Sequence, residues 1–235
     1  LFILTQLIIL TKTNKMKKIT TLFILLLSTA TIAQSISVDV VSNYIWRGAD
    51  LGGFSIQPSI SKDLGPIEVG VWSSYTLDGT SAGAELDLYV SGSIGSFDVA
   101  VTNYSYPGAA GYEGAFEFEG GPQTGLEASV GTSFGDFSIM GGFFFDNEDM
   151  YVEVGYPLGG FDVAIGGGDN AYSVDGEFAL VNVSLSSSKD IKLSESFSLP
   201  LSGSLIYNPD VDIMYVAFGI KLMLPMLLFG LVVMI

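Results

Sequence analysis

The chain of 235 residues contains no cysteine and no histidine. The absence of cysteine excludes a disulfide framework, on which small exported domains commonly depend. A closed β-barrel needs no such framework, because its ladder of hydrogen bonds has no free edge. The absence of histidine excludes Ser-His-Asp triads, histidine-assisted lipid hydrolysis and nearly all zinc chemistry. Catalysis by a pair of carboxylates, as in sugar cleavage, stays an alternative that spacing alone does not support, and we expect no catalytic residues, no metal, no cofactor and no enzymatic activity.

Basic residues are also scarce: nine lysines and arginines stand against 25 acidic residues. Four of the nine lie before Gln34 and no acidic residue does, so the remainder has five basic and 25 acidic residues, a formal net charge of −20. Such a charge repels nucleic acid and anionic lipid. The apolar fraction of 49% with only 14% charged residues is unlike a soluble acidic protein. The balance favours a protein whose acids face a lumen and whose aliphatic residues face lipid.

The segment before Gln34 has the three parts of a secretory signal peptide, which we place at residues 16–33. Met16-Lys17-Lys18 is the basic region, residues 22–27 are the apolar region, and the cleavage site ends at Ala33. We interpret residues 1–15 as upstream sequence outside the natural protein. The apolar tail, 223–235, is interpreted as read-through or misassembled sequence, with an apolar helix as the alternative.

Between these ends, the chain alternates apolar residues with acidic or small ones, as in 67–71, 84–88, 97–101 and 150–154. A period of two indicates β-strands with two unlike faces. A soluble sandwich and a transmembrane barrel both show this alternation, but only the barrel leaves glycines, serines and acids in a wet lumen. We predict an all-β, antiparallel transmembrane β-barrel over residues 34–222.

The barrel is predicted to have about 12 strands, within a range of 10 to 14. Tight turns and longer polar connections alternate imperfectly between these strands, and an even strand number would bring both chain ends to the periplasmic side. The predicted strands are 36–47, 54–61, 67–75, 84–93, 97–106, 125–133, 137–145, 149–156, 161–168, 177–187, 197–207 and 212–222.

The charged residues of the strands fall on their polar faces. Arg47 shares a face of the first strand with Asp39 and Asn43, and an arginine in a membrane strand is costly toward lipid. Two interpretations stay open: an ionic network that pins the barrel shut, with Arg47 bridging to Glu85 or Asp87, or a charged constriction that selects cations. The predicted lumen-lining residues are Arg47, Glu68, Glu85, Asp87, Glu127 and Glu153. The predicted anchors at the membrane interface are Tyr44, Trp46 and Phe161.

Several motifs in residues 36–107 resemble the TorF family of candidate porins in order and spacing. They are Ser42-Asn43-Tyr44-Ile45-Trp46-Arg47-Gly48, Ile56-Gln57-Pro58, Gly70-Val71-Trp72-Ser73-Ser74, Glu85-Leu86-Asp87-Leu88-Tyr89 and Tyr104-Ser105-Tyr106-Pro107. Beyond residue 107 the resemblance is one of texture, ending with the strand Tyr215-Val216-Ala217-Phe218-Gly219-Ile220. The resemblance implies an outer-membrane β-barrel, with no assigned substrate and no catalytic residues.

These observations favour a porin that passes small solutes, cationic ones in particular, through a narrow acidic lumen. The expected location is the outer membrane of a Gram-negative bacterium, and the expected partners are outer-membrane lipid and the barrel-assembly machinery. A non-conducting structural or adhesive barrel with a plugged lumen is the first alternative. A soluble exported β-sandwich is the second.

Overall fold

The structure is a computed structural model that describes residues 34–77, 84–107, 124–195 and 197–223. The predicted signal peptide and residues 1–15 lie outside these ranges, as does the apolar tail beyond residue 223. Among the described residues, no helix combines the length and the hydropathy required to cross a membrane.

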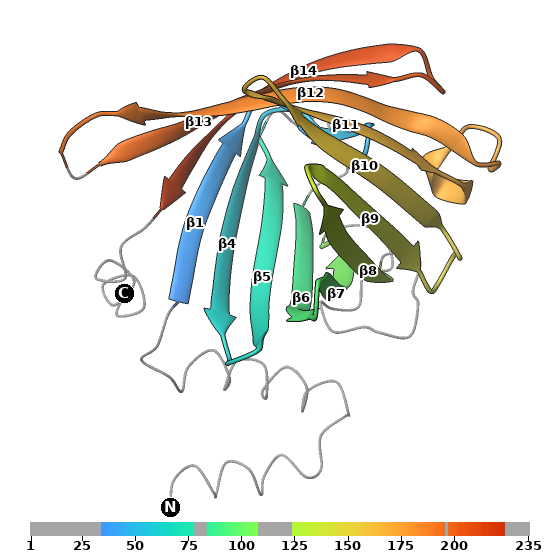
Figure 1. Ribbon diagram of the computed structural model, residues 1–235, viewed down its shortest axis with the longest axis horizontal. Helices are drawn as coiled ribbons and strands as arrows, with labels where there is room; N and C mark the ends of the chain where they lie inside the picture. Colours follow the sequence, from blue (N-terminus) through green and yellow to red (C-terminus); the bar gives the residue numbers. More distant parts are fainter. Residues whose placement is uncertain (1–33, 78–83, 108–123, 196, 224–235) are drawn as a thin grey trace, which may run out of the picture.

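Twelve of the strands close into an antiparallel barrel in which β1 pairs with both β4 and β14 (Figure 1). This confirms the predicted fold class and strand number. The barrel strands are β1 (Gln34–Val41), β4 (Ser55–Asp63), β5 (Ile67–Thr76), β6 (Ala84–Ile94), β7 (Phe97–Ser105), β8 (Thr124–Phe134), β9 (Phe137–Phe144), β10 (Met150–Leu158), β11 (Phe161–Gly168), β12 (Ala179–Lys192), β13 (Ser198–Asn208) and β14 (Ile213–Met223).

Each barrel strand has one apolar and one polar or small face, because successive side chains point to opposite sides of a strand. On β8, for example, Val130 is 46% exposed on the outward face, whereas its neighbours Ser129 and Gly131 share the inner face with Glu127. The exposed outward side chains form an apolar belt on the barrel. Its members include Ile67, Val90, Ile94, Val101, Val130, Phe134, Ile139, Val152, Val154, Ile165, Leu185, Leu205, Val216 and Phe218.

The two ends of the barrel differ in their connections. At one end, the short-turn end, neighbouring strands are joined by two to five residues, whereas the connections at the other end, the long-loop end, have four to 18. The start of β1 and the end of β14 both lie at the short-turn end, where Ser37 pairs with Met223. The arrangement matches the predicted alternation of tight turns and longer connections.

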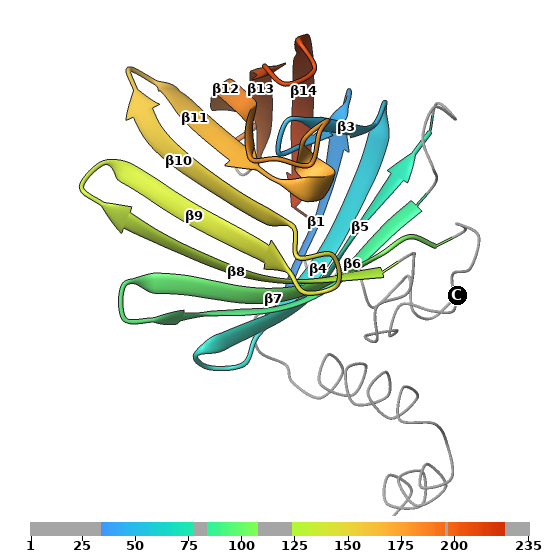
Figure 2. The ribbon, with the colours of Figure 1, turned by 90° about the vertical axis from the view of Figure 1, so that its right-hand side faces the viewer.

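The first predicted strand, 36–47, is wrong beyond Val41. Two short strands, β2 (Tyr44–Trp46) and β3 (Ala49–Gly52), pair with each other rather than with the barrel and form a hairpin on the inner side of the ring (Figure 2). The turn between them is Arg47-Gly48, with φ angles of 50° and 81°. Two successive positive φ angles are typical of the two-residue hairpin turns that fit the twist of paired strands. The β2–β3 hairpin therefore replaces the predicted continuation of the wall.

Candidate functional site

The β2–β3 hairpin reaches across the lumen at the long-loop end. The chain leaves the wall at Ser42, whose backbone N–H donates to the Phe218 carbonyl over 2.8 Å. At the tip, the Asn208 side chain donates to the Gly48 carbonyl over 3.1 Å. A Cβ at Gly48 would overlap the Val181 carbonyl oxygen of β12, so only glycine allows this approach. The tip is thus docked against the wall by backbone contact.

Arg47 extends from the tip to Glu127 on β8, five strands from β1 around the barrel. Arg47 Nη1 lies 2.7 Å from Glu127 Oε1, and the two side chains are 9% and 3% exposed. The guanidinium also donates to the Tyr172 hydroxyl. It lies 4.3 Å from the Trp46 ring centre and 4.7 Å from that of Tyr151. Contacts at these distances add cation–π attraction to the ion pair.

The expected pairing of Arg47 with Glu85 or Asp87 is wrong. The hairpin turn carries the guanidinium past β6, so that Glu127 on β8 becomes its partner. In the ranges that the structure describes, neither Glu85 nor Asp87 forms an ion pair with a basic residue.

Tyrosine hydroxyls hold two of the lumen carboxylates. Tyr104 donates to Glu127 Oε2 over 2.8 Å, and Tyr151 donates to Glu153 Oε2 over 2.6 Å. The Asn182 amide donates to the same Glu153 oxygen over 2.8 Å. Arg47, Glu127 and Glu153 therefore belong to one cluster, because the Tyr151 ring lies under the Arg47 guanidinium. We call the charged and aromatic residues of this cluster, together with the Asn182 amide, the constriction. Its members are Trp46, Arg47, Tyr104, Glu127, Phe144, Tyr151, Glu153, Tyr172 and Asn182.

Aromatic packing completes the constriction. The Trp46 ring centre lies 5.7 Å from that of Tyr104, 5.9 Å from that of Tyr172 and 6.4 Å from that of Phe144. Burial raises the pKa of the Tyr172 hydroxyl to about 12, although Arg47 acts in the opposite direction. The hydroxyl is therefore protonated at neutral pH and can accept a hydrogen bond from Arg47 while keeping its own proton to donate.

Tyr44 and Trp46 do not serve as the predicted interface anchors. Trp46 lies in the constriction, and the Tyr44 ring centre lies 5.4 Å from that of Trp72 on β5. Both aromatic residues lie on the inner side of the barrel because they belong to the hairpin. Phe161, at the start of β11, is exposed at the short-turn end, and its role as an anchor stays a prediction.

The remaining predicted lumen residues fall into two places. Glu85 and Asp87 lie two residues apart on the inner face of β6, near Tyr44. Glu68 lies toward the short-turn end, where Ser61 and Tyr89 donate to its two carboxylate oxygens over 2.9 and 3.0 Å. Glu68 is thus separate from the constriction.

Sequence reasoning missed Tyr104, Phe144, Tyr151, Tyr172 and Asn182. A signal existed for Tyr104 and Tyr151, because each alternates with outward residues on a strand that has a polar inner face. No local signal existed for Tyr172, which lies on the 3₁₀ helix η2 (Asn170–Tyr172) between β11 and β12.

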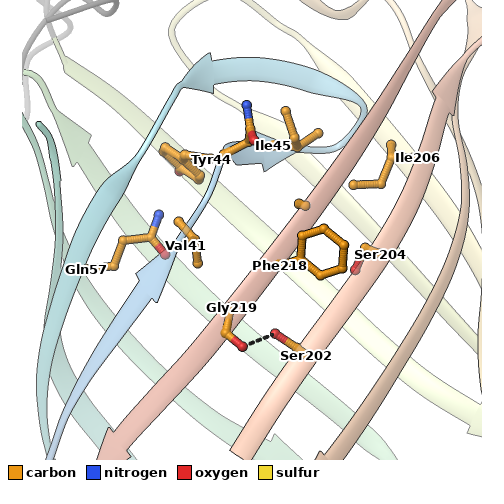
Figure 3. A pocket seen from close by; sticks show the side chains of 11 residues that line it. Val41, Tyr44, Ile45, Gln57, Ser202, Ser204, Ile206, Phe218 and Gly219 are labelled. Carbon is orange, nitrogen blue, oxygen red and sulfur yellow. Dashed lines mark hydrogen bonds between the residues drawn. The ribbon is translucent and has the colours of Figure 1, made fainter. Parts of the chain in front are cut away.

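Two cavities lie beside the barrel wall, one of them next to the hairpin. One, of about 230 Å³, lies between the hairpin and the wall formed by β1, β4, β13 and β14 (Figure 3). Its lining includes Tyr44, Gln57, Ser204 and Ser202, and Ser202 donates to the Gly219 carbonyl over 3.3 Å. The second, of about 360 Å³, is lined by residues of β6 to β9. Its lumen-facing members are Ser91, Ser93, Asp98, Ala100, Ser129, Gly131 and Met140.

No family model and no curated protein matches the chain. Among solved structures, outer membrane phospholipase A from Escherichia coli is similar in fold, with 11% identity, a TM-score of 0.39 and coverage of 81% of this chain and 90% of that one. A mutant of the Rh. blastica porin has 10% identity and a TM-score of 0.36, and covers 72% of this chain. OccK8 (OprE) from Pseudomonas aeruginosa has 12% identity and a TM-score of 0.34, and covers 82% of this chain.

The chain matches about 55% of the length of the Rh. blastica porin and 63% of that of OccK8. These likenesses concern a β-barrel fold and are too weak to transfer a function. The resemblance to the TorF family stays a prediction. The established result is therefore a closed, 12-stranded antiparallel β-barrel with a hairpin folded into its lumen.

Proposed function

We propose that the protein is an outer-membrane β-barrel that forms a narrow, acidic channel for small solutes. The apolar belt supports the membrane location, because a barrel that spans a membrane turns its aliphatic face to lipid. In this proposal, the short-turn end faces the periplasm of a Gram-negative bacterium, and the barrel-assembly machinery inserts the chain. The proposal assigns no catalytic residue and no cofactor.

One observation favours a channel over a filled barrel: the inner face of the short-turn half consists mostly of serine, glycine and alanine. Small barrels without a lumen are filled by large side chains from the wall. Here, the lining of the larger cavity is mostly small residues, among them Ser91, Ala100, Ser129 and Gly131. Side chains of this size leave space along the axis, and the hairpin narrows that space only at the long-loop end.

The charges near the hairpin support a preference for cations. Four carboxylates, on Glu85, Asp87, Glu127 and Glu153, lie on the inner face near the hairpin, together with the single guanidinium of Arg47. Carboxylates that line a narrow pore lower the energy of a passing cation and raise that of an anion. Because the pore is narrow and its walls are apolar outside, this selectivity should persist at moderate salt.

Conductance of the purified barrel in a planar bilayer tests the proposal. We expect discrete conductance steps and, in a salt gradient, a reversal potential of the sign given by cation permeation. A reversal potential that shows anion preference would contradict the acidic-lumen proposal. The complete absence of conductance would favour the alternative, a structural barrel closed by its hairpin, for which the burial of Arg47 and Glu127 is the supporting observation.

Membrane insertion is tested separately by cysteine labelling, which is possible because the chain has no native cysteine. Val130→Cys places a thiol on the outward face of β8, and Ser129→Cys places one next to it in the lumen. In intact membranes, a lipid-soluble maleimide should label the first variant, and a charged, water-soluble maleimide should label the second. Equal reactivity of the two variants toward both reagents would refute insertion.

A further inference from the structure

Within the described residues, two lumen carboxylates outside the constriction form no ion pair. Glu85 and Asp87 are both 6% exposed and stand two residues apart on the inner face of β6, so their Cα atoms are separated by about 7 Å. The Tyr44 side chain forms a hydrogen bond with Glu85. Asp87 Oδ1 is buried and has no hydrogen-bond partner within the part of the chain that the structure describes. A buried carboxylate oxygen without a donor is costly.

Aromatic residues are the neighbours of Asp87 on the adjacent strands. In the strand register, Trp72 of β5 lies directly opposite Asp87 on one side, and Tyr104 of β7 lies opposite it on the other. Directly opposite residues point to the same face of a sheet. Tyr44 approaches from the hairpin, with its ring centre 5.4 Å from that of Trp72. Asp87 is therefore placed among three aromatic rings.

Two basic residues on the inner side of the barrel, Arg47 and Lys221, form ion pairs with other carboxylates. Arg47 is bound to Glu127, and Lys221 lies 3.3 Å from Asp39 on β1. The polar pair is also unsuited to a divalent metal, because Ca²⁺ takes six to eight oxygen ligands. Among the described residues, no group of three or more acidic or other metal-ligating side chains is arranged to hold an ion.

An organic ammonium group meets the requirements of the site better than a metal does. Its N–H donors can satisfy Asp87 Oδ1 and the Glu85 carboxylate at the same time, since an ammonium carries three of them. Its positive charge is attracted to the faces of tryptophan and tyrosine rings, which recur around bound organic cations. Its short alkyl group can lie against the Trp72 ring rather than in water.

We propose that Glu85 and Asp87, together with Tyr44, Trp72 and Tyr104, form a binding subsite for small primary-ammonium cations. The subsite names the solute class of the proposed channel and rests on that function for access through the lumen. A solute ammonium group occupies the site reversibly, offsets one of the pair's two negative charges and supplies the hydrogen bond that Asp87 Oδ1 lacks.

Calorimetric titration of the detergent-solubilised barrel with methylammonium chloride tests the subsite, with sodium and calcium chlorides as comparison salts. We expect saturable binding of one methylammonium per chain. Asp87→Asn removes the charge and the acceptor, and should weaken binding by about tenfold or more. Glu85→Gln is a second variant and should weaken binding in the same direction.

Glu68→Gln is the matched control. It removes one lumen charge as well, but from a carboxylate that already accepts hydrogen bonds from Ser61 and Tyr89, and it should leave methylammonium binding within about twofold of the parent. Circular dichroism of every variant confirms that the barrel is folded.

Three outcomes would overturn the subsite. Binding by Asp87→Asn equal to that of the parent would mean that this carboxyl takes no part. Equal weakening by Asp87→Asn and Glu68→Gln would reduce the effect to overall charge. Calcium binding that depends on Asp87, without methylammonium binding, would assign the pair to a metal. The channel proposal fails separately: methylammonium binding without conductance removes the channel and keeps the subsite, whereas conductance without binding does the reverse.

Discussion

Replacing Arg47 with alanine should destabilise the barrel more than the loss of any other described ion pair. The Arg47–Glu127 pair is nearly fully buried, with a separation of 2.7 Å and exposures of 9% and 3%. Removing one partner of a buried pair costs about 3–5 kcal/mol, mainly because the other charge stays buried without compensation. Loss of cation–π contacts with Trp46 and Tyr151 adds to that cost, whereas water entering the lumen reduces it. We expect Arg47→Ala to lower the free energy of unfolding by about 3 kcal/mol.

Lys221→Ala provides the control. Lys221 and Asp39 also form a lumen ion pair, at 3.3 Å, but their side chains are 45% and 27% exposed. Solvent-exposed pairs contribute about 0–1 kcal/mol. Urea unfolding in detergent micelles, followed by tryptophan fluorescence, measures both variants. The double variant Arg47→Ala, Glu127→Gln then isolates the coupling, and it should recover part of the stability that Arg47→Ala loses, because the orphaned charge is removed.

The single variant Arg47→Ala has a second readout, the ion selectivity, if the barrel conducts. Loss of the guanidinium removes the positive charge from the constriction, so the reversal potential should move further toward that of a cation-selective pore. The reasoning is refuted if Arg47→Ala loses no more stability than Lys221→Ala and leaves the conductance unchanged. That result would place Arg47 in solvent rather than in a buried pair.

Two further substitutions test the hairpin and its contacts. Gly48→Ala should destabilise the barrel by about 1–3 kcal/mol, because Gly48 has a positive φ angle and an added Cβ would overlap the wall. The control, Gly95→Ala, also has a positive φ angle but open space around it, and should cost less. Equal unfolding midpoints of the two variants would contradict the docked tip. Tyr104→Phe should cost about 1–3 kcal/mol in the same unfolding assay, because it leaves the buried Glu127 carboxylate oxygen without its donor. Tyr156→Phe, on the exposed outward face, is the control and should be nearly neutral. Equal effects of the two substitutions would contradict the hydrogen bond from Tyr104 to Glu127.

Local patterns in the sequence were enough to predict the barrel. Alternation with a period of two depends on residues within one strand, and the composition favoured a barrel over a soluble sandwich. The strand number, the antiparallel order and the placement of both ends at the short-turn end follow from these patterns together with turn lengths. Glu127 and Glu153 were assigned to the inner face on the same basis, and their contacts with lumen side chains agree with that assignment.

The hairpin and the partner of Arg47 required the closed structure. Asp39, Asn43 and Arg47 fall on one side of a period of two, which does not distinguish a strand that stays in the wall from one that turns inward. The turn is decided by non-local contacts, such as the bond from Asn208 to the Gly48 carbonyl across 160 residues of chain. The partner of Arg47 likewise depends on which wall strand the hairpin tip meets once the barrel has closed. Closure brings β8 to that tip, and no local period in the sequence encodes it.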